Sequence, residues 1–498
     1  MKLNVNTPAA ASNRPLFGCG VGADDGTELF AITLSVVLTS NGNSLEQSVR
    51  NDIASGRAGD RLPSVRELVR RHGVGPVTVQ RLVDRLAHEG LVDPVPGRGT
   101  FIVGPREVVA GDWSWQTVAL GSRPMPGEGM VGLAAEHSSA VISLATGYPD
   151  RTLQSLDLLA TAGARAVRQP SSWGRSPVEG LAPLRDWFAA EVGGDVRADD
   201  VVVIAGGQAA LSASFRGLAA PGDPVVVEAP TYAGAIDAAR LAGLRPIPVA
   251  TDEHGIRIDQ LAAALRTSDA RLVYLQPTTS NPTGITMPAD RRREVLELAR
   301  TAGAFIIEDD YARDLQSEGH QPSPMINDDR DGHVVYIRSL TKSAAPALRI
   351  AAMVAKGPAL RRLRNARLVD DFFVSAVLQE TALGVVTSAG WPRHLARLRR
   401  AVGQRMAIAC RAIEADDSLS LAVHPAGGLV LWVGIDDRLD DVAVSRAALD
   451  RGVAVSPGRT WFCAEPSGSF IRVSVAAADG AAIAEGVRRL GDAVRASG

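Results

Sequence analysis

Apolar residues recur with helical spacing over the first part of the chain, from residue 45 to residue 86. Leu45, Val49 and Ile53 stand four residues apart, which predicts one amphipathic helix that ends near Gly56. Two further helices are predicted by two apolar sets, Val65, Leu68 and Val69, and then Val79, Leu82, Val83 and Leu86. A hairpin is predicted over 91–95 and 100–103, joined by the turn 96–99.

Exposed polar residues of this unit point to nucleic acid. Ser64 is placed to cap the second helix, and Pro76 is placed to begin the third. The third helix presents Thr78, Gln80, Arg81 and Arg85, which can hydrogen-bond bases or pair with phosphates. Positive charge is added by Arg66 and Arg70 on the second helix and by Arg98 in the hairpin turn. The unit fits a winged helix-turn-helix, whose later helix enters the major groove. The alternative is a small helical module that packs against the rest of the chain.

Beyond Val141 short apolar runs alternate with helical stretches. The runs predict strands over 201–204, 224–228, 272–275, 304–307, 334–337 and 350–354, and the helical stretches 208–218, 233–241 and 289–302 supply crossovers. The runs do not alternate with polar residues, as expected for parallel strands covered on both faces. This pattern predicts an α/β doubly wound sheet, which binds ligands at the carboxyl ends of its strands. A mixed α/β tail after Gly390 predicts a second, smaller subdomain.

The pattern divides the chain into four segments. Residues 1–40 are expected to be a weakly ordered extension, 41–103 the helical unit, 104–140 a linker rich in Gly, Pro and Ser, and 141–498 the α/β domain. Trp113 and Trp115 are expected to dock part of the linker. The apolar run 29–38 is shorter than the roughly 20 residues of a membrane-spanning helix. It also lacks the cleavage pattern of a signal peptide, so no membrane association is expected.

Composition adds three constraints. The net charge of −2 argues against a DNA coat or a membrane-surface protein but leaves room for one basic patch. The three cysteines lie far apart without metal-ligand spacing, which fits a reducing cytoplasm and predicts no metal site. Of 53 basic residues only Lys2, Lys342 and Lys356 are lysine. An internal lysine therefore invites the question of what arginine could not do there.

Lys342 follows a predicted strand and so lies at the ligand-binding edge of the sheet. A lysine amine can lose its proton and form a Schiff base with an aldehyde, which arginine cannot do. The alternative is a solvated loop lysine. Six nearby groups favour the chemical interpretation because they can hold a phosphate: Ser339, Thr341, Arg349 and the strand-to-helix turn Gly206, Gly207 and Gln208.

Four further residues suit an aromatic, pyridine-like cofactor. Asp309 follows the run 304–307, where its carboxylate can pair with a protonated ring nitrogen; its alternative role is a helix N-cap. Asn281 and Tyr311 can donate to a ring oxygen, and Tyr232 offers a face on which the ring stacks. The sequence thus predicts pyridoxal 5'-phosphate chemistry at one edge of the sheet.

Two resemblances support these interpretations. Segments 62–68 (LPSVREL), 73–79 (GVGPVTV) and 97–103 (GRGTFIV) resemble the GntR family of bacterial repressors. The resemblance places the Arg66 and Thr78 positions and the wing glycines among the groups that contact DNA. One departure is visible, because Gly75-Pro76 stands where the family often has Ser-Arg, so the resemblance does not carry over the base contact expected from that arginine.

From about residue 141 the chain resembles fold-type I, pyridoxal-phosphate-dependent aminotransferases. Six motifs occur in the family's order: GGQ at 206–208, PTY at 230–232, NPTG at 281–284, EDDY at 308–311, SLTK at 339–342, and Arg472. The resemblance implies that Lys342 holds the cofactor, that Asp309 faces the pyridine nitrogen, and that Arg472 takes a substrate carboxylate. The family's tyrosine before Gly180 is replaced by Gly174-Arg175-Ser176, where Arg175 could reach a partner subunit's phosphate instead.

The two resemblances in this order give the layout of the MocR subfamily of GntR regulators. That layout implies a head-to-tail homodimer that binds operator DNA, senses pyridoxal phosphate or an amino compound, and often controls vitamin B6 or amino-acid genes. Two alternatives stay open. The chain could be a working aminotransferase with an incidental N-terminal module, or its cofactor site could be purely structural.

Overall fold

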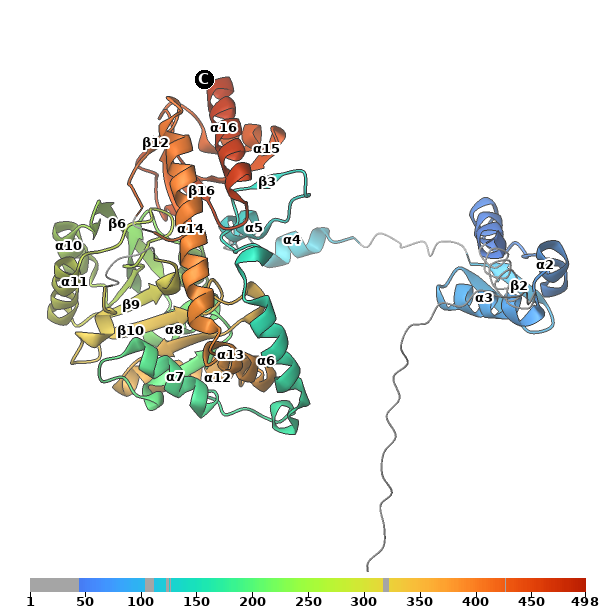
Figure 1. Ribbon diagram of the computed structural model, residues 1–498, viewed down its shortest axis with the longest axis horizontal. Helices are drawn as coiled ribbons and strands as arrows, with labels where there is room; N and C mark the ends of the chain where they lie inside the picture. The colour runs from blue at the N-terminus through green and yellow to red at the C-terminus, as the bar shows by residue number, and fades with distance from the viewer. Residues whose placement is uncertain (1–43, 104–111, 122–124, 126, 317–321, 426) are drawn as a thin grey trace, which may run out of the picture. The chain divides into compact units, whose positions relative to one another are not determined.

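The computed structural model describes residues 44–103, 112–121, 125, 127–316, 322–425 and 427–498 (Figure 1). They fall in two compact units, one before and one after residue 124. The apolar run 29–38 and the predicted N-terminal extension lie outside the described residues.

The first unit has the predicted order of elements. Residues 44–55 are helical and are followed by α2 (Val65–His72), α3 (Pro76–His88), β1 (Val92–Val95) and β2 (Gly99–Ile102). The capping predictions are confirmed, since Ser64 Oγ accepts a hydrogen bond from the Glu67 main-chain N at 3.3 Å and Pro76 opens α3. The predicted apolar stripes meet in one core, which includes Leu45, Val49, Leu68, Val79, Leu82, Val83 and Leu86.

The hairpin pairs antiparallel, with Val92 opposite Ile102. Gly99 in its turn has a φ of 117°, and a Cβ there would collide with the Arg61 guanidinium. The wing therefore needs glycine at this position for both conformation and space.

The segment predicted as a linker contains two short helices, α4 (Ser114–Leu120) and α5 (Glu128–Ala134). The expectation that Trp113 and Trp115 dock part of the segment is wrong for the described residues, because the two side chains are 66% and 62% exposed. The physical reason lies in α4, which has no buried residue and so offers no packed surface. α5 belongs to the second unit, where it packs against α9 (Ala233–Leu241).

The second unit is built on an eight-stranded sheet in the order β4-β11-β10-β9-β8-β5-β6-β7. Its strands are β4 (Val201–Ile204), β5 (Pro224–Ala229), β6 (Arg245–Asp252), β7 (Gly255–Ile256), β8 (Leu272–Leu275), β9 (Phe305–Asp310), β10 (Val334–Ser339) and β11 (Ala351–Val354). The prediction of parallel strands holds for the pairs from β10 to β6. It is wrong for β11, which runs antiparallel to both β10 and β4. An uninterrupted apolar run indicates that a strand is buried on both faces, but it does not indicate in which direction the strand runs. This explains the error.

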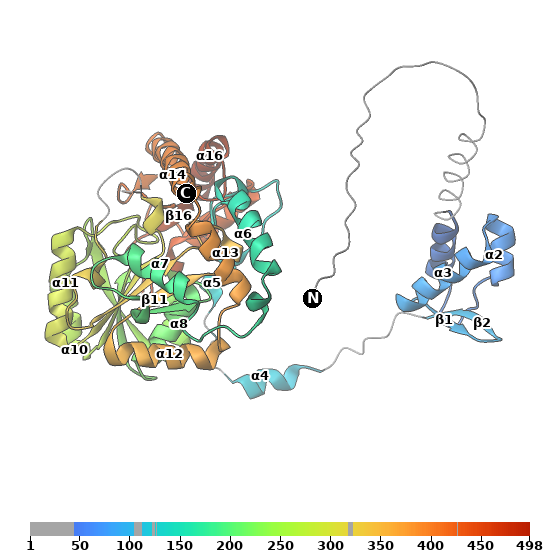
Figure 2. The same ribbon diagram turned by 60° about the horizontal axis from the view of Figure 1, so that its bottom comes forward.

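Helices cover both faces of this sheet, as Figure 2 shows. One core packs Val201 and Val203 against α7 (Ala182–Val192), α10 (Ile258–Ser268), α11 (Ala289–Ala302) and α13 (Ala376–Val386). The other packs Val202 and Ile204 against α8 (Gly207–Leu218), α9 and α12 (Gly357–Asp371). Successive residues of a strand point to opposite faces, so both cores arise from one uninterrupted apolar run.

The predicted second subdomain begins with α14 (Trp391–Glu414), the long orange helix of Figure 1. A four-stranded sheet follows in the order β12-β13-β16-β15, made of β12 (Ser420–Leu421), β13 (Val430–Gly434), β15 (Ser456–Pro457) and β16 (Phe470–Ser474). The remaining elements are α6 (Leu156–Arg168), α15 (Asp441–Asp450), α16 (Gly480–Ser497) and the parallel pair β3 (Ile142–Ser143) and β14 (Val453–Ala454). No helix in the described ranges has both the length and the apolar composition that crossing a bilayer requires.

Candidate functional site

The predicted site residues gather where the parallel strands end. Lys342 follows β10, Asp309 lies near the end of β9, and Asn281 follows β8. Tyr232 follows β5, and the turn at Gly206 follows β4. Burial and the charge of Asp309 raise the pKa of Tyr232, and the charges of Arg472 and Arg349 act on both Tyr232 and Lys342, so the sheet edge forms one site.

Lys342 has an amine suited to act as a nucleophile. Burial, together with the positive charges of Arg472 and Arg349, lowers the pKa of Lys342 to about 7, and the charge of Asp309 opposes this shift. Its Nζ lies 3.8 Å from the centre of the Tyr148 ring. A lysine with this pKa is largely neutral just above pH 7, which is the form that attacks a carbonyl carbon.

Asp309 is a buried carboxylate held on one oxygen. The Tyr274 hydroxyl donates to its Oδ2 at 3.0 Å, and Gln276 Nε2 donates to the same atom at 2.9 Å. Burial raises the pKa of Asp309 to about 6, and the two donated hydrogen bonds oppose that rise. The predicted N-cap alternative does not apply, since Asp309 lies within β9.

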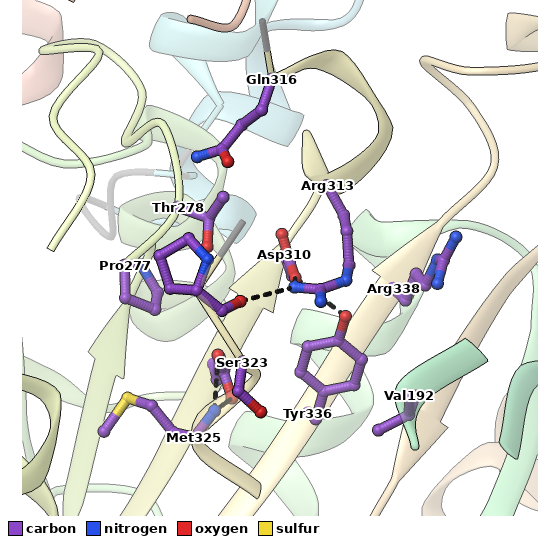
Figure 3. A network of polar contacts seen from close by, with 12 residues as sticks. Val192, Pro277, Thr278, Asp310, Arg313, Gln316, Ser323, Met325, Tyr336 and Arg338 are labelled. Carbon is purple, nitrogen blue, oxygen red and sulfur yellow. Dashed lines mark hydrogen bonds and ion pairs between the residues drawn. The ribbon is translucent and has the colours of Figure 1, made fainter. Parts of the chain in front are cut away.

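The two neighbours of Asp309 point to the opposite face of the sheet. Glu308 accepts from the main-chain N of Met325 and lies 3.5 Å from the Arg292 guanidinium. Asp310 accepts from the Tyr336 hydroxyl at 2.9 Å and from Arg313 Nη1 at 3.0 Å, an arrangement seen in Figure 3. These bonds hold the end of β9 in place. The motif at 308–310 thus places the Asp309 carboxylate in the site and fixes the carboxylates of Glu308 and Asp310 on the opposite face of the sheet.

The turn after β4 forms a cup for an anion. Gly206 has a φ of 92°, and a Cβ there would collide with the Arg349 guanidinium. Arg349 Nη2 donates to Ala205 O at 2.8 Å, and α8 starts at Gly207. The segment that leads to Lys342 adds two hydroxyls, since Ser339 Oγ and Thr341 Oγ1 lie 2.9 Å apart. Hydroxyls, a guanidinium and a helix N-terminus are the donors that bind phosphate.

Gln208 holds its place through Nε2, which donates to Gly234 O at 2.8 Å. Its Oε1 is buried without a hydrogen-bond partner in the described part of the chain. A buried polar atom without a partner is costly, so the cup fits a ligand that supplies a donor or admits water. The residues present therefore fit a phosphate-bearing aromatic cofactor.

Arg472 is fully buried on β16, not exposed on the strand surface. Its Nε donates to Asn281 Oδ1 at 3.0 Å, its Nη1 donates to Ala145 O at 2.6 Å, and its guanidinium lies 4.7 Å from the centre of the Trp461 ring. The side-chain oxygen of Asn281 is thus engaged by Arg472, and the Tyr311 hydroxyl donates to Thr279 O at 2.9 Å. Of the two predicted ring-oxygen donors, the Tyr311 hydroxyl is therefore engaged by a main-chain oxygen, whereas Asn281 uses its acceptor oxygen for Arg472 and keeps its side-chain NH₂ as the donor.

Four site residues were missed by the sequence analysis: Tyr148, Tyr274, Gln276 and Trp461. Gln276 joins three parts of the site, because its main-chain N donates to Glu228, its Nε2 donates to Asp309, and its Oε1 accepts from the Asn281 main-chain N. Tyr274 and Gln276 are two residues apart, and the alternation of a strand could have placed both on the face of Asp309. Tyr148 and Trp461 carry no such signal.

The predicted DNA-contacting residues are all exposed on the first unit: Arg66, Thr78, Gln80, Arg81 and Arg98. Arg66 and Arg81 have no ion pair or side-chain hydrogen bond to any described residue, whereas Gln80 Nε2 donates to Asp84 at 2.9 Å. Arg85, also predicted to face DNA, pairs with Glu46 at 2.6 Å. Arg175, the predicted substitute in the second unit, is exposed as well.

Comparison with known proteins identifies both units. Residues 140–490 match the family model of aminotransferase class I and II, and residues 41–102 match that of bacterial regulatory proteins of the gntR family. The chain is 33% identical over 361 residues to 2-aminoadipate transaminase of Thermus thermophilus, covering 71% of this chain and 90% of the transaminase. It is 30% identical over 432 residues to the vitamin B6 salvage pathway transcriptional repressor PtsJ of Salmonella typhimurium, covering 85% of this chain and 92% of the repressor.

The fold has a close solved counterpart. It is LysN, an alpha-aminoadipate aminotransferase from Thermus thermophilus, complexed with N-(5'-phosphopyridoxyl)-L-leucine. The two structures agree with a TM-score of 0.70 at 30% identity, over 78% of this chain and 99% of LysN.

We predict that Glu228→Gln stabilises the second unit above neutral pH. Burial raises the pKa of Glu228 from 4.5 to about 7. Between these values the folded protein keeps a proton that the unfolded chain releases, so the free energy of unfolding falls as the pH rises, by roughly 3 kcal/mol in all. Glutamine keeps the carbonyl that accepts from Gln276 but cannot ionise.

Urea unfolding between pH 4.5 and 8 measures the effect. The variant should lose most of this decline, and Glu253→Gln, at an exposed carboxyl, should behave as wild type. Parallel stability curves for Glu228→Gln and wild type would contradict the prediction.

Proposed function

The chain belongs to the aminotransferase class I and II family and carries a GntR-family domain at residues 41–102, and we propose that it is a DNA-binding transcription regulator that responds to pyridoxal phosphate. One observation carries the proposal. A single chain joins a unit that exposes unpaired arginines on α2 and α3 to a unit that buries a complete site around Lys342. This is the layout of the MocR subfamily.

The residues of the site have separate tasks toward the cofactor. Bound pyridoxal phosphate supplies an aldehyde that condenses with amines and a ring that withdraws electrons. Lys342 offers the amine, and Asp309 offers a buried carboxylate to the pyridine nitrogen. The groups that would bind the phosphate are Ser339, Thr341, Arg349 and the turn Gly206, Gly207 and Gln208. Tyr232 would supply a face on which the ring stacks. Asn281 accepts a hydrogen bond from Arg472, and the Tyr311 hydroxyl donates one to Thr279 O. These bonds hold the Arg472 side chain and the loop at Thr279 in place.

An amino compound is the effector that the site suits. Arg472 is a buried guanidinium, positioned by Asn281, and such a group pairs with a carboxylate through two parallel hydrogen bonds. An amino acid would therefore bring its carboxylate to Arg472 and its amine toward Lys342.

α5 offers a physical route from the site toward the linker. The Tyr232 hydroxyl lies 3.8 Å from Met130 Sδ, and Leu133 packs in the cluster that contains Trp461 and Trp432. Tyr232 and Trp461 are the aromatic residues of these contacts, and both would face the cofactor or the effector. A ligand that shifts Tyr232 or Trp461 would thus shift α5, and with it the chain segment that leads back to the DNA-binding unit.

The DNA-binding unit would act as a pair. Helix-turn-helix proteins bind two half-sites as dimers, and we infer a head-to-tail homodimer on double-stranded operator DNA in the cytoplasm. The likeness to PtsJ supports vitamin B6 or amino-acid genes as targets.

Transamination is a second candidate function. It is favoured by a buried Lys342 and a buried Asp309 whose charges act on each other, and by the likeness to 2-aminoadipate transaminase. Formation of a keto acid from an amino acid at an enzyme's usual rate would place catalysis ahead of regulation.

We predict that Lys342→Ala abolishes the visible absorption of the protein loaded with pyridoxal phosphate, because the variant lacks the amine that bonds the cofactor. Borohydride should then fix cofactor to the wild type but not to this variant. Lys356→Ala is the matched control, since Lys356 pairs with Asp195 at 2.6 Å on the surface. Cofactor fixed to the Lys342→Ala protein would refute the assignment.

We predict that Arg66→Ala and Arg81→Ala each weaken binding to the protein's own upstream DNA and leave the cofactor spectrum unchanged. A lost phosphate contact should lower the salt dependence by about one unit, and a lost base contact should cost roughly 1–3 kcal/mol and relax specificity. Arg85→Ala should have a smaller effect, because Glu46 holds that guanidinium. Gel-shift titration at several salt concentrations measures all three, and full affinity in both test variants would exclude this surface.

We predict that the cofactor, alone or with an amino acid, changes operator affinity by about 5–150-fold, the usual range for coupled sites. The change arises only if the ligand binds the two arrangements of the protein unequally. Operator titrations with apoprotein, loaded protein and loaded protein plus amino acids test it. Equal affinities in all three states would leave the cofactor site without a signalling role.

A further inference from the structure

A hollow of about 450 Å³ lies in the α/β unit, and Lys342 is not among its lining residues. Its walls come from the loop before α6 and from the first turns of α6 and α14. The charged residues that line it are Arg151, Asp157, Arg393 and Arg397. None of the cofactor-site residues lines it, so the hollow needs its own explanation.

The arginines of this hollow have no acidic partners. None of the three lies within 4.0 Å of a carboxylate of the described residues, Asp157 included, whereas Arg405, further along α14, pairs with Asp150 at 2.6 Å. Arg397 reaches only neutral atoms, Gln154 O at 3.5 Å and His394 Nδ1 at 3.4 Å. Three guanidiniums on one concave wall repel one another, and an anion between them would remove that repulsion.

The helix ends add to this positive potential. Ser155 and Gly390, the N-cap residues of α6 and α14, both line the hollow, and neither makes a side-chain capping bond. The positive dipole ends of both helices thus face the same space, although in the first turn of α14 the main-chain N of Trp391 already donates to Ser388 O and residue 392 is a proline.

The wall of the hollow also holds the loop that carries Lys342. His394 is buried, and its Nε2 lies 2.6 Å from Ser343 O. The main-chain N of Ser155 donates to Ala344 O at 3.1 Å. Ser343 and Ala344 directly follow Lys342. A ligand that moves Ser155 would therefore act on the lysine loop through one hydrogen bond, and a ligand that moves Arg397 would act on it through His394.

We propose that this hollow is a regulatory site for a small molecule that carries a phosphate group. A phosphate dianion offers three acceptor oxygens, which match guanidinium forks and helix N-termini together. A hollow of this volume lies in the range of small-molecule sites and is concave, whereas contact with DNA phosphates needs only a convex basic surface.

Inorganic phosphate is the probe. The full-length protein, saturated with pyridoxal phosphate so that the cup at Gly206 is filled, is titrated calorimetrically at constant ionic strength. Wild type should bind phosphate saturably, and the double variant Arg151→Gln/Arg393→Gln should bind at least tenfold more weakly. Arg400→Gln, an exposed arginine of the same helix outside the hollow, should bind as wild type. These exposed substitutions remove charge and leave the packed core unchanged.

The same samples test the link to Lys342. Saturating phosphate should shift the midpoint of the pH titration of the visible band in wild type and not in the double variant. An unshifted wild-type midpoint would overturn the regulatory part of the proposal. Equal phosphate affinity in wild type and double variant would overturn the site itself. Weakened binding of non-specific duplex with unchanged phosphate affinity would assign these arginines to DNA.

These outcomes do not depend on the function proposed for the cofactor domain. Wild type, double variant and control share the residues around Lys342, so any phosphate bound there contributes equally to all three.

Discussion

The burial of Lys342 and Asp309 at one edge of the sheet is the constraint on which the second unit depends. Burial moves the pKa of the lysine down to about 7 and that of the aspartate up to about 6, so each group resists its own charge. Such a pair is expensive to desolvate and persists only where the fold fixes both partners. β9 and β10 do this as adjacent parallel strands, and Asp310, Arg313 and Tyr336 lock the far face of β9.

The same constraint explains which parts of the fold were predictable. Uninterrupted apolar runs such as 201–204 and 272–275 have to become buried strands, and both appear with the predicted bounds. The direction of β11 was not predictable, because antiparallel pairing at this point depends on the short loop between Lys342 and Ile350 and not on side-chain polarity. Helix starts marked by Ser64 and Pro76 were predictable, since a capping hydroxyl and a fixed φ act locally.

The candidate site was predictable where the chemistry resides in a residue type and its place after a strand, as for Lys342 and Asp309. The site was not predictable where one side chain acts only by holding another side chain in position. Gln276 works by three hydrogen bonds to residues up to 48 positions away, and only the folded register brings them together. Asn281 shows the same limit, because its place after a strand was predictable but the hydrogen bond that its oxygen accepts from Arg472, 191 positions away, was not.

Because lysine is nearly absent, arginines serve in several different roles, and the sequence alone does not tell these roles apart. An arginine that pairs with a carboxylate, such as Arg85 with Glu46, contributes little potential at a distance, since its charge is compensated. Arginines without such partners attract anions more strongly, and those of α2 and α3 and those around the hollow at α14 are two groups of this kind among the described residues. A net charge of −2 therefore conceals two separate cationic surfaces, one suited to the phosphates of a duplex and one suited to a small anion. The lysine loop lies directly behind the second, which ties the reactive amine to both the cofactor cup and the hollow.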